Sequence, residues 1–379
     1  MKIAFFTDSY HPQVNGLVTS IDTFVDDLMK QGHEVHIFAP NVPGHVDKSK
    51  RVKRFRSFQF PAYKEYRIAV PKIIKHRFDV VHVHSPFSLG LSGIIYARKN
   101  NVPVVGTFHT LFSEYGHYLI KSETLLKIFK KTYKRLTWSY LRWFYNQCDF
   151  VTAPSERIKF LLAKHGVKKP IYFIPTGVKT RLRNKNKKAL RSKYGFGDEK
   201  IILHIGRITK EKNILFILNS LRRLLKKENA VFVITSDGPY KNELQEHAKN
   251  LGLRNKVMFT GYLSNEQLKD FYAIADLFVL ASKSETQGIV LIEAVANKLP
   301  IVALNAPVTG DFLKENDYGI VANAGNFAEK VSLALRNEKL RIASTKNVSK
   351  ILEKYDSERC ARELANVYKK AIRSQDTLS

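Results

Sequence analysis

Two glutamates in the second half of the chain carry its most specific chemical signal. Glu285 and Glu293 are separated by seven residues, and Gly288 stands where a helix would begin. The apolar run 277–281 before them is typical of a buried parallel strand. A strand, a polar loop and a helix N-terminus form the place where α/β proteins hold phosphate groups. The pair could bind the hydroxyls of a nucleotide sugar, although two glutamates on a helix are also commonly just solvated.

Two polar loops in the first half of the chain also follow predicted strands. The stretch 8–16 ends in Asn15 and Gly16 before a helical pattern, and Gly16 lets a backbone approach a ligand that a Cβ would block. His109 follows the apolar run 104–107 and would place an imidazole at the end of that strand. A single histidine is more often structural, so His109 indicates a functional site only in combination with the other loops.

In the second half, two cations and a turn follow predicted strands. Arg207 and Lys212 come after the run 201–205 and are fixed cations of the kind that a departing diphosphate requires. Asp237 lies in the turn that ends the next strand, where a base or a ribose could bind. Each loop alone could be an ordinary surface loop, but their common position at strand ends predicts one functional site.

Short apolar runs alternate with helical patterns along the whole chain, which is typical of βαβ units and parallel sheets. Helices are expected at 17–31, 214–227 and 240–251. Strands are expected in two series, at 3–7, 35–39, 80–84, 104–107, 150–153 and 171–174, and then at 201–205, 231–236, 257–260, 277–281 and 301–304. The pattern leaves the order of the strands within each sheet open.

The chain has 379 residues, which is more than one ordinary core holds. A stretch rich in lysine and arginine, and almost free of apolar residues, separates the two series of strands and resembles a linker. The predicted fold class is α/β, with two doubly wound, Rossmann-like domains facing across a cleft. We expect an N-terminal domain at 1–178, the basic linker at 179–197, a second domain at 198–356, and a C-terminal helix at 357–379 that packs back on the first domain.

The composition narrows the classes of partner. The chain has 63 Lys and Arg against 34 Asp and Glu, a formal net charge of +29, so its field attracts nucleic acid, an acidic membrane surface or a phosphorylated ligand. The alternative is that the charge has no functional meaning and reflects a proteome that is rich in lysine. Two cysteines favour a reduced, intracellular setting. No segment approaches the ~20 apolar residues of a membrane span, so a soluble or peripheral protein is expected.

Two basic segments rich in aromatic residues, 51–77 and 121–145, interrupt the pattern of the first domain. The second is a helical pattern whose predicted membrane-binding residues are Lys127, Lys130, Lys131, Lys134, Arg135 and Trp138. A basic amphipathic helix with interfacial aromatic residues is typical of a membrane-surface helix. A helix packed on the core with a solvated basic face is the alternative, but two such segments in one domain favour the membrane.

These motifs together resemble those of the retaining GT-B glycosyltransferases. The resemblance covers nearly the whole chain and rests on the Asn15-Gly16 loop, on His109, on 175–178, on Gly206-Arg207 with Lys212, and on Glu285 with Glu293. Within that group the chain is most similar to the bacterial 1,2-diacylglycerol 3-glucosyltransferases, because of the stretch 7–16, the Glu285-Thr286-Gln287-Gly288 variant and the basic amphipathic segment. Many members have Phe in place of Gln287 and Asn-Gly in place of Thr176-Gly177.

The resemblance implies that the domain at 1–178 binds the acceptor and the membrane and that the domain at 198–356 binds the nucleotide sugar. It also implies a role for each matched residue. Gly16, with Asn15, would close over the donor diphosphate, and His109 would contact the transferred sugar. Arg207 and Lys212 would neutralise the diphosphate as it leaves, and Asp237 would lie beside the nucleoside. The remaining roles belong to the motif that contains both glutamates. Glu285 would hold the sugar hydroxyls, and Glu293 would bind the ribose. The amides of Gly288, Ile289 and Val290 would lie nearby.

The predicted function is therefore a metal-independent, retaining transfer of glucose from UDP-glucose to 1,2-diacylglycerol, by a peripheral protein at the cytoplasmic face of the cell membrane. No Asp-x-Asp metal motif is present; His82 and His84 alternate on one strand, but no third ligand is apparent. A mannosyl- or galactosyltransferase acting on another lipid or cell-envelope acceptor is the alternative. A nucleic-acid-binding protein is a remote one, since it leaves the glutamate pair unexplained.

Overall fold

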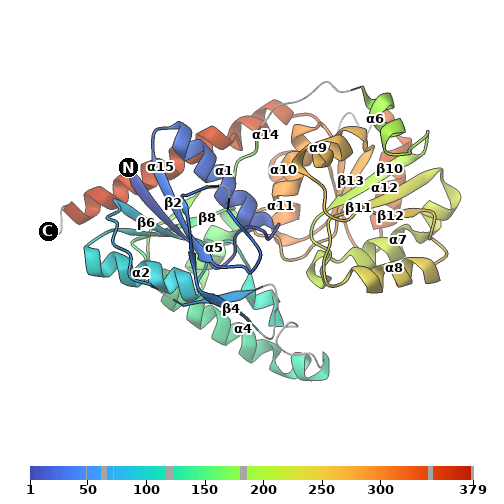
Figure 1. Cartoon of the computed structure of the whole chain (residues 1–379). Coiled ribbons are helices and arrows are strands. Elements are labelled where there is room, and N and C mark those ends of the chain that lie inside the picture. Colours follow the sequence, from blue (N-terminus) through green and yellow to red (C-terminus); the bar gives the residue numbers. More distant parts are fainter. Residues whose placement is uncertain are drawn as a thin grey trace. The chain divides into compact units, whose positions relative to one another are not determined.

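The structure is a computed structural model that describes residues 1–47, 49–60, 66–70, 72–116, 123–179, 186–339 and 345–376, without the side chains of 123–127 and 376. The chain forms two compact units (Figure 1). Unit 1 comprises Met1–Gly177 and Asp356–Ser379, and unit 2 comprises Val178–Tyr355. Among the described residues, no helix is both long enough and apolar enough to cross a membrane.

Unit 1 is built on a seven-stranded parallel sheet with the order β3-β2-β1-β6-β7-β8-β9. Its strands are β1 (Lys2–Phe6), β2 (Glu34–Pro40), β3 (Val52–Phe55), β6 (Val80–Val83), β7 (Val104–Thr107), β8 (Phe150–Ala153) and β9 (Ile171–Phe173). A separate antiparallel hairpin consists of β4 (Ser57–Gln59) and β5 (Arg67–Ala69). The strands are apolar almost throughout because helices bury both faces of a parallel sheet.

The helices of unit 1 are α1 (Gly16–Lys30), α2 (Ser88–Asn100), the 3-10 turn η1 (Phe112–Glu114), α4 (Glu123–Tyr145), α5 (Glu156–Lys164) and α15 (Ser357–Asp376). Buried residues of α1 and α15 form one core with the sheet, and those of α2, α4 and α5 form a second core. Figure 1 shows α15 running beside α1, although the two are more than 300 residues apart in the sequence. The C-terminal helix therefore completes the first Rossmann-like unit.

Unit 2 has a six-stranded parallel sheet with the order β12-β11-β10-β13-β14-β15. Its strands are β10 (Lys200–Ile205), β11 (Ala230–Thr235), β12 (Val257–Phe259), β13 (Leu277–Leu280), β14 (Ile301–Leu304) and β15 (Ile320–Ala322). Its helical elements are α6 (Lys187–Lys193), the 3-10 turn η2 (Lys210–Lys212), α7 (Ile214–Lys227), α8 (Lys241–Asn250), α9 (Asn265–Ile274), α10 (Ile289–Ala296), α11 (Pro307–Glu315), α12 (Phe327–Arg336) and α14 (Val348–Lys354).

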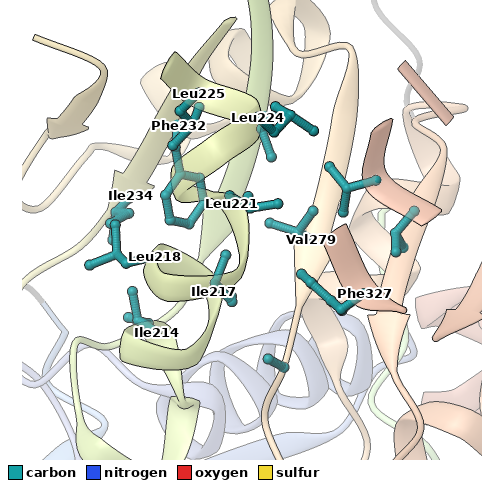
Figure 2. Close-up of a cluster of buried hydrophobic side chains, with 14 of the residues drawn as sticks. Ile214, Ile217, Leu218, Leu221, Leu224, Leu225, Phe232, Ile234, Val279 and Phe327 are labelled. Atoms are coloured by element: carbon teal, nitrogen blue, oxygen red, sulfur yellow. The ribbon is translucent and has the colours of Figure 1, made fainter. Parts of the chain in front are cut away.

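The core of unit 2 lies between its sheet and helices such as α7 and α12. Apolar residues recur along α7 at the spacing of one helix face, for example Ile214, Leu218, Leu221 and Leu225, and all four are fully buried. Figure 2 shows this face turned toward Phe232 of β11 and its neighbours on the sheet. Burial of an apolar side chain of this size stabilises a fold by about 1.5–3 kcal/mol. Packing of α7 thus holds the strand ends that carry the polar loops.

The strands expected from apolar runs are all present, and the α/β, doubly wound prediction is confirmed. The sequence pattern missed β3, β4, β5 and β15, which are short and lie at sheet edges or in a hairpin. Part of the predicted linker 179–197 is also structured, since α6 packs in unit 2. Lys187 and Arg191 pair with Asp276, and Lys193 pairs with Asp270. Basic residues that looked solvated are thus matched by acids distant in the sequence; residues 180–185 lie outside the described part.

Candidate functional site

The polar loops of unit 2 gather where the strand order changes direction. From β10 the chain moves through β11 to β12 on one side, and from β13 through β14 to β15 on the other. β10 and β13 are neighbours, so the loops that leave their carboxyl ends diverge and leave room for a ligand. Arg207 and Lys212 follow β10, and Glu285 and Gly288 follow β13. The residues predicted from separate motifs are therefore at one edge of one sheet.

Lys212 and Glu285 make direct contact at this edge. Their Nζ and Oε1 atoms are 2.6 Å apart, and their side chains are 24% and 11% exposed. Burial acts to raise the pKa of Glu285, but the charge and the hydrogen bond of Lys212 outweigh it and hold that pKa below its ordinary value. The glutamate is therefore an anion at neutral pH, in a position with little solvent.

Two further contacts hold the loops of this site in register. Asn213, directly after Lys212, has a left-handed backbone with φ of +57° and donates from its side-chain amide to the carbonyl oxygen of Ala281 at 3.2 Å. His204, on β10, is buried, and its Nδ1 lies 3.1 Å from the carbonyl oxygen of Val279 on β13. Burial lowers the pKa of His204 to about 4, so the ring is neutral behind the ion pair.

Gly288 and helix α10 provide backbone donors beside the ion pair. Gly288 precedes the helix with φ of +77°, a left-handed conformation that residues with a Cβ rarely adopt. The helix starts at Ile289 and Val290, whose N–H groups belong to the first turn and lack intrahelical acceptors. Such N–H groups, with the positive end of the helix dipole, favour an anion such as a phosphate.

Glu293 lies one turn further along α10 and is held by Tyr272. The Tyr272 hydroxyl donates to Glu293 Oε2 at 2.7 Å and lies 3.2 Å from the carbonyl oxygen of Val290. Burial raises the pKa of Glu293, and the hydrogen bond from Tyr272 only partly opposes this. The two glutamates of the motif therefore differ in environment, because Glu285 has a cation and Glu293 has a neutral donor.

Asp237 precedes helix α8 and pairs with the first residue of that helix. Its Oδ2 pairs with Lys241 Nζ at 2.7 Å, and its Oδ1 accepts from the Gly238 amide at 2.7 Å. The hydrogen bond from Lys241 is the main reason that the pKa of Asp237 is below its ordinary value. The adjacent Gly238 packs closely against the loop after β10, since a Cβ there would lie 2.2 Å from the carbonyl oxygen of Ile208.

Gly238→Ala is therefore expected to destabilise unit 2 by about 1–3 kcal/mol, because the methyl group meets backbone that can only move with its loop. The shift in the thermal unfolding midpoint would measure this, at roughly 2–4 °C per kcal/mol for a unit of this size. Gly325→Ala is the matched control, since none of the described atoms lies within 4 Å of the place that its methyl group would take, and its φ is not left-handed. Equal midpoints for the two variants would contradict the expectation.

In unit 1, Asn15 and Gly16 form the start of α1. Asn15 is the N-cap residue: its Oδ1 accepts from the Val18 amide at 3.0 Å, and its Nδ2 donates to Ser9 Oγ at 3.1 Å. Gly16 is the first helical residue and is exposed. The loop is thereby held in one conformation in which its glycine faces solvent, as the predicted ligand contact requires.

Asp8 is a further residue of this region, and its role was not predicted from the sequence. It is buried, and its carboxylate accepts from Ser88 Oγ, from Ser85 Oγ at 2.6 Å and from the Leu89 amide at 2.9 Å. Burial raises its pKa despite these hydrogen bonds. Asp8 thus joins the loop after β1 to the first turn of α2, and its position directly after a strand was the available signal.

His109 follows β7 and faces a second histidine. Its Nε2 lies 3.0 Å from Nδ1 of His84, which follows the neighbouring strand β6. Burial lowers the pKa of His109 to about 3, so its ring is neutral at physiological pH. His82 on the same strand contacts Tyr368 and Thr107 through its two ring nitrogens, at 2.5 Å each. No group of three metal-ligating side chains occurs among the described residues.

The basic helix α4 presents both charged and apolar side chains to solvent. Lys130, Lys131 and Arg135 are exposed, whereas Lys134 Nζ pairs with Glu114 Oε1 at 2.5 Å. The side chain of Lys127 lies outside the described residues. Among the side chains of this helix that the structure describes, the exposed apolar ones are Ile128, Phe129, Leu136, Tyr140 and Trp143, with Ile128 65% and Leu136 61% exposed.

Trp138, predicted as a membrane-binding residue, is partly buried against the rest of unit 1. Its ring stacks on His165 with centroids 3.8 Å apart and lies parallel to Phe108 at 6.1 Å. Trp138 therefore packs against the second core of unit 1, while Trp143 on the same helix is 49% exposed. The two tryptophans are five positions apart along α4, a spacing that places them on different faces of a helix with 3.6 residues per turn.

Comparisons with known proteins identify the family. Residues 14–182 match the family model described as Glycosyltransferase Family 4, and residues 186–351 match Glycosyl transferases group 1. The chain is 36% identical to an alpha-monoglucosyldiacylglycerol synthase from Streptococcus pneumoniae over 84% of this chain and 74% of that protein. It is 30% identical to one from Acholeplasma laidlawii over 97% of this chain and 96% of that protein.

Solved structures show the same fold at low sequence identity. The chain superimposes on sucrose-phosphate synthase from Thermosynechococcus elongatus with a TM-score of 0.80, at 18% identity over 98% of this chain and 99% of that one. Anabaena HepE in complex with UDP and glucose matches with a TM-score of 0.75, at 16% identity over 98% of this chain and 100% of that one. With the two Rossmann-like units and the predicted motifs, the chain belongs to the GT-B glycosyltransferases, in the family that includes the alpha-monoglucosyldiacylglycerol synthases.

Proposed function

We propose that the protein transfers glucose from UDP-glucose to 1,2-diacylglycerol at a membrane surface, with retention of configuration and without a metal ion. The Lys212–Glu285 pair carries the proposal, because it places a largely buried anion and a cation at the edge where an α/β sheet binds its ligand. Two relatives named as alpha-monoglucosyldiacylglycerol synthases support the choice of sugar and lipid.

The donor would bind to unit 2. Glu285 is ionised and can accept hydrogen bonds from two hydroxyls of the sugar. The diphosphate would lie at the start of α10, where the first-turn N–H groups meet the charge of Lys212, and Arg207 follows the adjacent strand. Glu293 and the Tyr272 hydroxyl would hold the ribose.

This arrangement stabilises a departing diphosphate by position and charge. As the bond from the sugar C1 to the phosphate oxygen lengthens, negative charge grows on the phosphate, next to Lys212 and the helix amides. The acceptor hydroxyl would attack C1 from the same face, and its proton would pass to the leaving phosphate, which yields an α-linked product from an α-linked donor. No side chain is assigned as a nucleophile in this route.

A donor panel tests the proposal. UDP-glucose, UDP-galactose and GDP-mannose would each be offered with diacylglycerol in micelles that contain an anionic lipid. We expect glucosyl-diacylglycerol in the α configuration, identified by mass and by the anomeric proton coupling. Product from GDP-mannose alone would instead favour the mannosyltransferase alternative, for which a GDP-mannose-dependent alpha-mannosyltransferase from Mycobacterium tuberculosis at 26% identity is the specific precedent.

Helix α4 would hold the enzyme at the membrane. Lys130, Lys131 and Arg135 are exposed on the same helix as the exposed apolar residues Phe129 and Leu136, which is the composition of an interfacial helix. The cations would meet anionic lipid headgroups while the apolar side chains enter the boundary of the acyl chains.

Neutralising Lys130, Lys131 and Arg135 to glutamine together is expected to weaken binding to anionic vesicles by roughly 100-fold, since each basic residue at such a surface contributes about 1 kcal/mol. Vesicle sedimentation would measure the affinity. The control changes Arg222, Arg223 and Lys226, on the exposed face of α7, to glutamine and so removes the same charge from unit 2. Its binding to anionic vesicles should stay within about threefold of that of the parent. Equal losses in the two variants would mean that net charge, and not α4, drives binding.

A further inference from the structure

His84 is a buried residue to which the donor chemistry above assigns no part. It follows β6, its backbone N–H donates to the carbonyl oxygen of Phe6, and its side chain is 1% exposed. Its Nδ1 is the atom 3.0 Å from Nε2 of His109. Two neutral imidazoles can form this hydrogen bond only if one of the two facing nitrogens carries a proton and the other does not.

The other ring nitrogen of His84 indicates which residue is the donor. His84 Nε2 is buried and has no hydrogen-bond partner among the described residues. If His109 were the donor, His84 would carry its own proton on that nitrogen and leave a buried N–H group unsatisfied. Buried N–H groups without a partner are rarer than buried acceptors without one. The less costly arrangement has the proton of His84 on Nδ1, from which it donates to His109.

The surroundings of His84 fix its ring in this orientation. Its centroid lies 4.5 Å from that of Phe5 and 4.0 Å from that of His82. His82 is itself held on both nitrogens, by Tyr368 of the C-terminal helix and by Thr107 of β7. Burial keeps the pKa of both His82 and His84 well below the ordinary value, so the cluster is uncharged. Rotation of His84 would therefore require repacking of three strands and α15.

We propose that His84 is a positioning residue for the transfer reaction: its Nδ1–H donates to His109 Nε2 and holds the His109 ring in the tautomer that carries its proton on Nδ1. The proton of His109 is then on the ring nitrogen opposite to His84, and an N–H group is the kind of donor that a sugar hydroxyl or a phosphate oxygen accepts from. The inference rests on the proposed function for the use of His109, but its structural part, the tautomer, can be tested separately.

Two substitutions separate the hydrogen bond from packing. His84→Asn keeps an N–H donor, because the asparagine side-chain amide occupies the place of Nδ1, whereas His84→Leu fills a similar volume without a donor. Nitrogen NMR of ¹⁵N-histidine-labelled protein would report the tautomer, with the His109 signals assigned from their loss in His109→Asn. We expect a protonated Nδ1 on His109 in the parent and in His84→Asn, and a shift toward a protonated Nε2 in His84→Leu.

Kinetics on the same variants tests the functional part. In His84→Leu we expect kcat to fall by roughly 10- to 100-fold, as when a supporting hydrogen bond behind a functional histidine is removed, while KM for diacylglycerol is unchanged. His84→Asn should remain within about threefold of the parent, and so should His247→Leu, a control on the surface of unit 2.

Two results would overturn the inference: a His109 tautomer that does not change in His84→Leu, or a loss in His84→Asn as large as that in His84→Leu. Circular dichroism would show whether each variant is folded before it is compared. If no donor and lipid pair gave transfer in any variant, the proposed function would fail, and the tautomer of His109 would still decide the role of His84.

Discussion

Glu285→Gln is expected to reduce kcat for transfer by about 10²–10³, the loss typical of removing one preorganised polar group from a transition state. The amide keeps the shape of the side chain and removes its charge, so Lys212, which is partly exposed, stays in contact with solvent and the loop keeps its packing. The sugar hydroxyls lose their anionic acceptor, and the charge that balances Lys212 in the free enzyme is gone.

Transfer of radiolabelled glucose into the lipid phase would measure the loss. Glu246→Gln is the matched control, because Glu246 pairs with Lys249 on the surface of α8 and both side chains are more than 60% exposed. That control should stay within about twofold, since surface ion pairs contribute little. A Glu285→Gln enzyme that kept a third of the parent kcat would contradict the donor site as assigned.

Lys212→Met should cause a loss of similar size, about 10²–10³ in kcat, for the complementary reason that the leaving diphosphate loses its fixed cation. The substitution also changes the titration of Glu285. In the parent, the pKa of Glu285 is below its ordinary value because Lys212 outweighs burial. Without the cation, burial prevails, and the pKa rises above the ordinary value.

The sign of the resulting pH dependence of stability follows from linkage. In the parent, the ion pair stabilises the fold at every pH above the pKa that glutamate has in the unfolded chain. This stabilisation is lost as the pH falls through the lower pKa that Glu285 has in the folded protein. In Lys212→Met, the raised pKa makes folding progressively less favourable as pH rises above about 4.3, the ordinary glutamate value. The difference in unfolding free energy between parent and variant should therefore be large near neutral pH and shrink in acid.

Urea unfolding at about pH 7.5 and about pH 4.5 would measure this difference directly. Lys249→Met, which breaks the exposed pair with Glu246, should show almost no difference between the two conditions. A gap between parent and Lys212→Met that is the same at both pH values would mean that Glu285 does not titrate with its partner. Activity and stability thus test the same contact by independent readouts.

Most of the fold could be predicted because its signals are local. Each buried strand of the two sheets is an apolar run bounded by polar residues, such as 277–280, and a helix such as α7 shows its apolar face in the spacing of its leucines and isoleucines. The edge strand β3 was missed because two of its four residues, Lys53 and Arg54, are charged, so it is not an apolar run.

Side-chain partners were predicted less well. Trp138 and Trp143 are the same residue type on the same amphipathic helix, and only packing against Phe108 and His165 shows which of them faces the core. Similarly, Lys187 has the sequence context of a solvated linker, but the fold places Asp276, distant in the sequence, beside it. The charge and aromatic content of a segment can be read from its sequence. The direction in which each side chain points depends on the residues from the rest of the chain that pack against that segment.

The α/β class, the two series of strands and the set of polar loops could be predicted from the sequence alone, because periodicity and motif spacing are properties of contiguous residues. Two contacts could be seen only in the folded chain: Lys212 and Glu285, 73 residues apart, lie 2.6 Å from each other, and His84 faces His109. Both contacts depend on which strands are neighbours, β10 with β13 and β6 with β7. Strand order depends on how whole helices pack between the sheet and the solvent, so it cannot be predicted from local sequence patterns.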